Sequence, residues 1–236
     1  MELTFLEHSG FMVETDHHIL IFDYYRDPAG KVAAKRGNGK KWFVFSSHNH
    51  GDHFNPAIAQ WQNDSYYFLS HDIAAESGTA AFMSDKISVM APYETCRQAT
   101  VTVKSFGSTD AGISFLVEVE GHKIFHAGDL NWWHWNGDTP ENIKQAAADF
   151  AREMEKLKGE SFDVAFFPVD SRLEEYRTLG VETFCRDTDP KLVVAMHAFG
   201  PVWEPPTPFC VENREIPLWI PKAAGETFIH EAKAVK

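Results

Sequence analysis

The stretch that decides the fold is His48-Asn49-His50-Gly51-Asp52-His53, which directly follows the apolar run Trp42-Phe43-Val44-Phe45. An H-x-H-x-D-H string placed after a strand-like run is typical of a loop that gathers ligands around metal. Imidazole nitrogen and carboxylate oxygen both bind zinc well, and a catalytic zinc keeps one position open for water. Residues two apart in an extended loop point the same way. We therefore expect His48 and His50 to bind one ion, and Asp52 and His53 to face a second.

A purely structural interpretation of the same stretch is a strand end followed by the start of a helix. Asp52 and Asn55 are both able to cap a helix, because Pro56 suits the first helical position. Capping does not require histidines in this register, so the metal interpretation is favoured.

Length and composition favour a compact enzyme. The 236 residues are predicted to form a single domain over positions 1–236, and a hydrophobic fraction of 44% is enough for a buried core. No signal-peptide pattern and no membrane-length apolar run is visible, which predicts that the protein binds no membrane. The three cysteines are scattered and odd in number, which favours the reducing cytoplasm. The net charge of −12 disfavours nucleic acid as a partner and leaves a small-molecule substrate, while the oligomeric state stays open.

Hydrophobic patterning predicts a β-meander at the start of the chain and βα units later. Residues 140–158 form the clearest helix, because apolar side chains recur there at three- and four-residue steps. Residues 27–41 are expected to form a polar loop, and 56–62 a short helix. The predicted strands are 3–6, 10–14, 19–22, 42–46, 66–70, 86–91, 101–106, 113–120, 123–125, 164–169 and 192–196, with 216–221 and 226–230 as a closing pair.

Other candidate ligands also follow predicted strands. Asp129 ends the string His126-Ala127-Gly128-Asp129, His197 follows the strand 192–196, and Asp110 lies in the turn before 113–120. Sites assembled from several strand ends bring together ligands that are distant in sequence. The structural alternatives are an ordinary turn role for Asp129 and Asp110, and a packed histidine at a strand end for His197.

Five motifs follow one another along the chain: His8-Ser9-Gly10-Phe11, Ile21-Phe22-Asp23, His48-Asn49-His50-Gly51-Asp52-His53, Phe125-His126-Ala127-Gly128-Asp129 and Met196-His197. In these motifs and in their order, the chain resembles the metallo-β-lactamase fold superfamily of metal-dependent hydrolases, and within it the branch similar to ascorbate-phosphate lactonase. The resemblance implies an α/β fold, the four-layer αββα sandwich, with the site along one edge of the packed sheets.

By this resemblance, His48 and His50 bind the first metal, Asp52, His53 and His197 bind the second, and Asp129 bridges the two. One departure is visible. The family's third histidine for the first metal is missing from residues 105–110, where Asp110 is the nearest residue able to ligate. Either Asp110 replaces it or the first metal is weak or absent. The cofactor is thus one or two divalent ions, with zinc expected and manganese or iron as alternatives, since a hard carboxylate would shift the preference.

Several residues near these motifs are candidates for substrate contact or for support of the ligands. His8 and Asp23 can bond a ligand from behind, and His126 can orient Asp129. His134 lies in the tryptophan-rich string Asn131-Trp132-Trp133-His134-Trp135-Asn136, which either plugs the core or walls a small-molecule pocket. Arg172 can hold a substrate carboxylate or phosphate, or can simply pair with Asp170.

The functional prediction is a hydrolase in which metal lowers the pKa of water and the resulting nucleophile attacks a small ester, lactone, amide or phosphoester. Asp52 is the predicted catalytic residue, because it can position the nucleophile as well as bind metal. Two alternatives stay open: a nuclease or phosphodiesterase of the same fold, and a non-catalytic metal-binding protein. A di-iron redox role is disfavoured, since the second histidine of the string is retained as His50.

Overall fold

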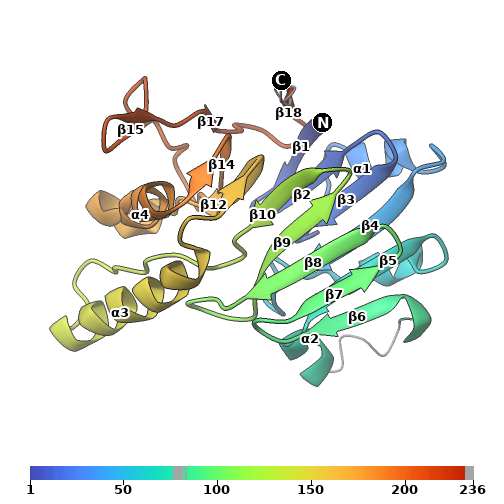
Figure 1. Cartoon of the computed structure of the whole chain (residues 1–236), viewed down its shortest axis with the longest axis horizontal. Coiled ribbons are helices and arrows are strands. Elements are labelled where there is room, and N and C mark those ends of the chain that lie inside the picture. Colours follow the sequence, from blue (N-terminus) through green and yellow to red (C-terminus); the bar gives the residue numbers. More distant parts are fainter. Residues whose placement is uncertain (77–81, 83, 232–236) are drawn as a thin grey trace. The chain divides into compact units, whose positions relative to one another are not determined.

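The structure is a computed structural model that describes residues 1–76, 82 and 84–231 (Figure 1). These residues form two compact units: the first unit lies within residues 1–91 and 221–236, and the second spans residues 92–220. Each unit contains a seven-stranded sheet accompanied by helices, so the predicted mixed α/β class is confirmed. The assignment of both units to a single domain stays a prediction. In the described part of the chain, no helix is long and apolar enough to cross a membrane.

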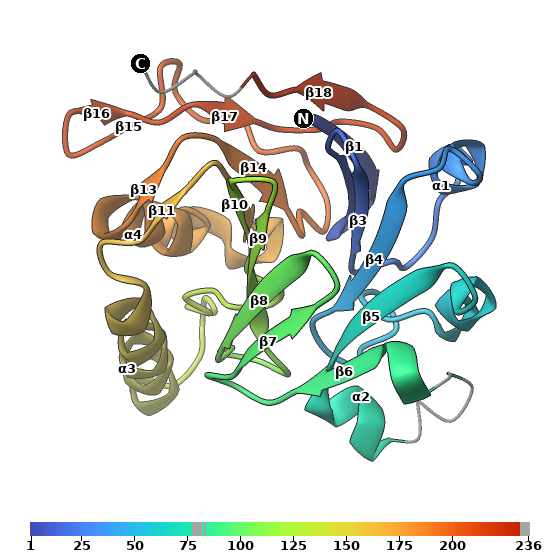
Figure 2. The same ribbon diagram turned by 45° about the vertical axis from the view of Figure 1, so that its right-hand side comes forward.

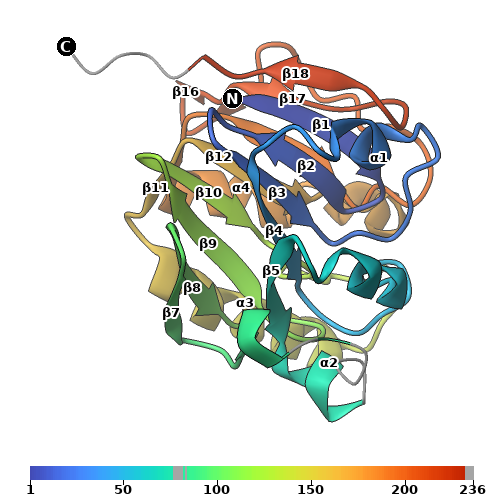
Figure 3. The same ribbon diagram turned by 90° about the vertical axis from the view of Figure 1, so that its right-hand side faces the viewer.

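The sheet of the first unit has the order β18-β1-β2-β3-β4-β5-β6 (Figure 3). Neighbours from β3 to β6 are parallel, whereas β2 is antiparallel to both β1 and β3. The strands are β1 (Glu2–Glu7), β2 (Gly10–Glu14), β3 (His18–Phe22), β4 (Lys41–Ser46), β5 (Ser65–Ser70), β6 (Ile87–Met90) and β18 (Thr227–Ile229).

Successive side chains of β4 point to opposite faces of this sheet, and they are buried on both. Trp42 and Val44 belong to the core cluster on one face, and Phe45 on the other face stacks between Phe22 and Phe68, with ring centroids 4.7 and 5.2 Å away. Burying one such side chain stabilises the fold by roughly 1.5–3 kcal/mol. The core cluster is covered by α1 (Lys31–Lys35), η1 (Pro56–Trp61) and α2 (His71–Ala75), which contribute Val32, Ile58 and Ile73; η2 (Ser84–Lys86) precedes β6.

The topology of the first sheet brings three chain segments to the same edge. Since β1, β3 and β4 run in the same direction, His8, Asp23 and His48 all lie just beyond their carboxyl ends. Gly10 permits this close approach, because a Cβ atom there would lie 2.9 Å from the Glu7 carbonyl oxygen and 3.0 Å from that of Asp23.

The sheet of the second unit has the order β17-β14-β12-β10-β9-β8-β7 (Figure 2). It begins as an antiparallel meander from β7 to β10 and continues with parallel neighbours from β10 to β17. The strands are β7 (Thr95–Gln98), β8 (Val101–Phe106), β9 (Ser114–Val119), β10 (His122–His126), β12 (Val164–Pro168), β14 (Val193–Met196) and β17 (Leu218–Trp219).

Two helices pack on one face of the second sheet. The helix α3 (Pro140–Leu157) is capped by Thr139, whose side chain accepts a hydrogen bond from the Asn142 N–H at 3.2 Å. Phe150 of α3 and Phe184 of α4 (Leu179–Asp187) both contact Phe167 of β12. The remaining elements are η3 (Ser171–Tyr176), the pair β11 (Ser161–Phe162) with β13 (Asp189–Pro190), and the pair β15 (Cys210–Val211) with β16 (Arg214–Glu215).

The structure corrects three expectations. The predicted polar loop 27–41 contains α1, because the Asp27 carboxylate accepts hydrogen bonds from the Lys31 and Val32 N–H groups and so caps a helix. The predicted helix 56–62 is a 3₁₀-helix, η1, with Asn55 as its cap. The last two strands do not pair with each other: β17 joins β14 and β18 joins β1, so they extend different sheets.

Candidate functional site

Asp23 organises the histidine string of the first unit. Its side chain is fully buried, and its two carboxylate oxygens accept hydrogen bonds from the Ser47 N–H and the Ser47 hydroxyl, both at 2.7 Å. The carboxylate also accepts from Nδ1 of His53 at 2.8 Å. The prediction that Asp23 bonds one of these histidines from behind is therefore confirmed. Since Nδ1 of His53 carries the proton, its Nε2 has the lone pair available for metal.

A second chain of hydrogen bonds fixes the tautomer of His48. The Ser47 hydroxyl donates its one hydrogen to Asp23, so the hydroxyl oxygen accepts from Nδ1 of His48 at 2.9 Å. In a metal-bound form, Nε2 would therefore be the nitrogen of His48 that faces the ion. Both rings are buried, and their centroids lie 4.1 Å apart. One buried carboxylate thus orients two histidines of the string.

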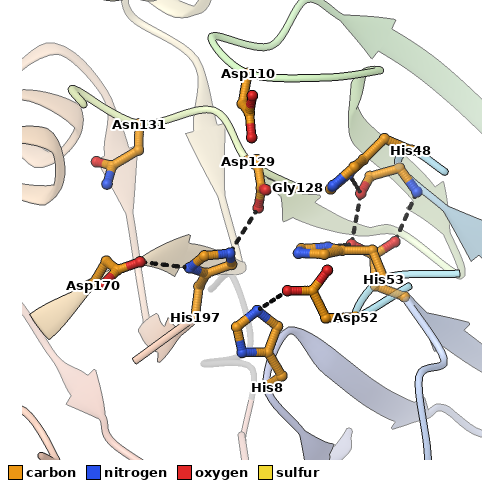
Figure 4. Close-up of polar contacts among 12 residues, drawn as sticks. His8, His48, Asp52, His53, Asp110, Gly128, Asp129, Asn131, Asp170 and His197 are labelled. Atoms are coloured by element: carbon orange, nitrogen blue, oxygen red, sulfur yellow. Dashed lines mark hydrogen bonds and ion pairs between the residues drawn. The ribbon is translucent and has the colours of Figure 1, made fainter. Parts of the chain in front are cut away.

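Asp52, a further member of the string, lies beside this pair (Figure 4). Asp52 faces His8, with Nε2 of His8 3.4 Å from a carboxylate oxygen of Asp52. One donor atom each from His8, Asp52 and His53 lie within 4.8 Å of one another. His50 is exposed, and its ring centroid lies 4.5 Å from that of His48. The first unit therefore presents several imidazole and carboxylate donors at one sheet edge.

The second unit presents its own group of donors, and its sheet topology explains why. Asp129, Asp170 and His197 follow β10, β12 and β14, three adjacent parallel strands whose carboxyl ends lie at the same edge. His197 lies between the two carboxylates: its Nε2 is 3.3 Å from Asp129 and its Nδ1 is 3.1 Å from Asp170 (Figure 4). All three residues are buried.

Electrostatics at His197 favour positive charge. Burial lowers the pKa of His197, but the carboxylates of Asp129 and Asp170 raise it more, to about 9. Burial raises the pKa of Asp170, but hydrogen bonds from His197 and Arg172 lower it more, so Asp170 stays ionised. The same surroundings would stabilise a divalent cation at Nε2 in place of the proton.

Asp110 points toward Asp129 in Figure 4, although Asp110 is exposed. A carboxylate oxygen of each lies within 4.8 Å of the other, a spacing that suits a shared cation. The turn that carries Asp110 is tied to the loop after Asp129 by Thr109, whose hydroxyl donates to the Asn131 carbonyl at 2.6 Å and accepts from the Asn131 N–H at 2.9 Å.

The remaining predicted residues have local partners. His126 is buried, and its Nδ1 accepts a hydrogen bond from the Gly128 N–H at 3.2 Å, so it shapes the turn that leads to Asp129. His134 stacks on Tyr176 at 3.8 Å. Arg172 donates to Asp170 through Nε and Nη2, which is the pairing alternative for this residue.

Two contributions were missed from the sequence. Ser47 links Asp23 to His48 through hydrogen bonds, and Asp170 accepts a hydrogen bond from Nδ1 of His197. Asp170 carried a usable signal, because it follows an apolar strand directly, as Asp129 and His197 follow theirs. Ser47 carried none, since a serine at a strand end is common.

Asp170→Asn is expected to weaken metal binding by about 10- to 100-fold, because a neutral amide no longer fixes the Nδ1 proton of His197. Competition with a fluorescent zinc chelator measures this change. Asp187→Asn is the matched control, since Asp187 also pairs with a neighbouring arginine, Arg186. Equal affinity of the Asp170→Asn protein and the unmodified protein would show that this carboxylate does not support a ligand.

Comparisons with known proteins agree with this architecture. A family model described as "Beta-lactamase superfamily domain" matches residues 2–136. A "UPF0173 metal-dependent hydrolase" from Pelotomaculum thermopropionicum is 26% identical over 223 residues, covering 84% of each chain. Another from Korarchaeum cryptofilum is 25% identical over 134 residues, which is 55% of this chain and 60% of that protein. The solved structure of Igni18, a metallo hydrolase from Ignicoccus hospitalis, has a TM-score of 0.60 at 17% identity and covers 98% of this chain and 99% of its own.

Proposed function

Because the chain belongs to the beta-lactamase superfamily, we propose that it is a metal-dependent hydrolase that binds one or two divalent ions through its histidine and aspartate side chains. The proposed ligands in the first unit are His48, His50, Asp52 and His53. Those in the second unit are Asp110, Asp129 and His197. Two metal-dependent hydrolases among the relatives and the family's order of motifs support this assignment.

One observation carries the proposal: each unit contains a histidine whose Nδ1 is held by a buried carboxylate. Asp23 and Asp170 are each fully buried, and each accepts a hydrogen bond from Nδ1 of a histidine, His53 in the first unit and His197 in the second. Histidines that bind metal nearly always donate their other ring nitrogen to such a group. A histidine that served only the core would not need a buried carboxylate, whose burial costs free energy.

The donor set fits a divalent ion. Imidazole nitrogens with carboxylate oxygens suit zinc, and extra carboxylates such as Asp110 would also suit manganese or iron. When bound, the ion lowers the pKa of water and stabilises negative charge on the carbonyl or phosphoryl oxygen that is attacked. The proposed substrates are small esters, lactones, amides or phosphoesters, and the ascorbate-phosphate-lactonase branch stays a prediction.

Asp52 has the proposed task of orienting the attacking water and accepting its proton. Its side chain is partly exposed, so solvent and substrate can reach it, whereas Asp129 is nearly fully buried. His8 lies 3.4 Å from Asp52 and restrains the carboxylate. His8 is therefore a positioning residue in this proposal, and the two roles separate kinetically, because loss of a general base lowers kcat more than it changes KM.

The experiment that tests the function is a panel of carboxylic esters, lactones, amides and phosphodiesters, assayed with added zinc or manganese. The expected result is hydrolysis of at least one class, which is lost after chelation and restored by metal. Exclusive cleavage of phosphodiesters would assign the chain to the phosphodiesterase alternative. Metal binding without any hydrolysis would favour the non-catalytic alternative.

A further inference from the structure

Three aromatic side chains form a partly exposed surface beside His197, which we call the aromatic rim: Trp133, Trp135 and Phe199. Trp133 is tied to a candidate ligand, because its Nε1 donates to the Asp129 carbonyl at 3.0 Å, and its ring centroid lies 5.7 Å from that of His197. Trp135 stacks on Trp133 at 5.6 Å with an angle of 8° between the rings. The Phe199 ring lies 5.2 Å from the His197 ring, and Phe199 is 45% exposed.

The positive charge of Arg172, which lies beside the rim, is balanced by Asp170. The Arg172 guanidinium lies 3.9 Å from the Phe199 ring centroid and 5.3 Å from that of Trp135. The Nε and Nη2 groups of Arg172 donate to the buried carboxylate of Asp170. These two groups form the fork of the guanidinium that would otherwise hold a substrate carboxylate or phosphate. The Arg172 fork thus serves Asp170, and the three side chains of the rim offer a substrate aromatic surface.

The backbone holds Phe199 in an unfavourable conformation. Its φ is 44°, in the left-handed region that aromatic residues rarely adopt, and His197 has a φ of 55°. The Ser171 hydroxyl donates to the Phe199 carbonyl at 2.6 Å, and the Ser171 N–H donates to the Ala198 carbonyl at 2.9 Å. Strain of this kind is characteristic of functional sites, where it holds a side chain in a set position.

We propose that the aromatic rim binds a flat, uncharged ring of the substrate, so that the protein prefers substrates whose acyl or leaving group is aromatic. The proposal rests on the proposed function, since it assumes that the bond to be cleaved lies near His197. Aromatic walls with few polar groups are typical of small-molecule sites, and stacked or edge-on ring pairs add to the affinity gained by burying area.

Calorimetric titration of the purified protein with phenylacetate, cyclohexylacetate and acetate tests the proposal, because the three share one carboxylate. Phenylacetate is expected to bind at least about tenfold more tightly than acetate, the size of one aromatic contact together with its buried area. Cyclohexylacetate should fall between them. Phe199→Ala and Trp135→Ala should each reduce the preference for phenylacetate without changing metal content. Tyr93→Ala is the matched control, since Tyr93 is also exposed, at 55%, and belongs to the same unit.

Equal binding of phenylacetate and acetate by the unmodified protein would overturn the proposal, and so would equal losses in the Tyr93→Ala and Phe199→Ala proteins. Sedimentation of the same proteins provides a further check. A dimer that dissociates on Phe199→Ala would assign the rim to a second copy of the chain and would also overturn the proposal. Metal analysis of each sample separates the two claims: a protein that binds metal but shows no ring preference contradicts the rim alone, and one that shows the preference without metal contradicts only the proposed function.

Discussion

His53→Ala is expected to lower kcat/KM by about 1,000-fold or more, because loss of a catalytic ion removes several kcal/mol of transition-state stabilisation and each ~1.4 kcal/mol is tenfold in rate. The structure gives His53 two properties of a ligand. It is fully buried, and its Nδ1 is held by Asp23, so that only Nε2 is available for coordination. The measurement is kcat/KM on the best substrate of the panel, with bound metal determined on the same sample.

His17→Ala is the control for this substitution, because His17 is exposed and lies outside the string. It should keep both metal and activity. Circular dichroism separates loss of metal from loss of the fold, since the His53→Ala protein should keep the spectrum of the unmodified protein. A folded His53→Ala protein with full activity would show that the string does not supply this ligand.

Asp110→Ala is expected to remove about one equivalent of metal and most of the activity, because a catalytic ion needs about three protein ligands besides water. The carboxylate of Asp110 lies within 4.8 Å of that of Asp129, which places it well to share an ion with the proposed bridging residue. Metal analysis after dialysis, followed by the hydrolysis assay, measures both effects.

Asp110→His provides the complementary result. This substitution introduces the histidine that the resemblance implies for this position, so it should retain the metal and shift the preference toward zinc over manganese. Asp138→Ala is a suitable control, since Asp138 is another aspartate of the second unit and is partly exposed. An Asp110→Ala protein with unchanged metal and activity would show that Asp110 does not ligate an ion.

Much of the fold could be predicted from the sequence, because the strands around the motifs are marked by simple patterns. The run ending at Ser46 became β4, and the runs ending near Val169 and Met196 became the fully buried parallel strands β12 and β14. The short helix α1 was not predicted, because it has no periodic apolar pattern to mark it. It depends instead on the Asp27 carboxylate, which accepts hydrogen bonds from N–H groups four and five residues away. The strands that pair with β17 and β18 were not predicted either, because pairing between segments distant in the sequence produces no local sequence pattern.

The candidate site was predictable to the extent that its residues follow strands. Asp23, His48, Asp129 and His197 all do so, and parallel neighbours bring their strand ends to one edge within each unit. The supporting contacts were less accessible. Arg172 pairs with Asp170, and Phe199 lies beside His197. Both contacts depend on the geometry of loops, which no periodic sequence pattern indicates.

The most direct test of the central claim is the metal content of four proteins after dialysis: unmodified, Asp52→Ala, His53→Ala and the double variant. Asp52 and His53 each offer a donor atom within 4.8 Å of the other, and the resemblance assigns both to the same ion. The account predicts that each single variant loses that ion and that the double variant loses no more than a single one, since ligands of one ion are not independent. Full metal content in either single variant, or losses that add in the double variant, would contradict this ligand assignment.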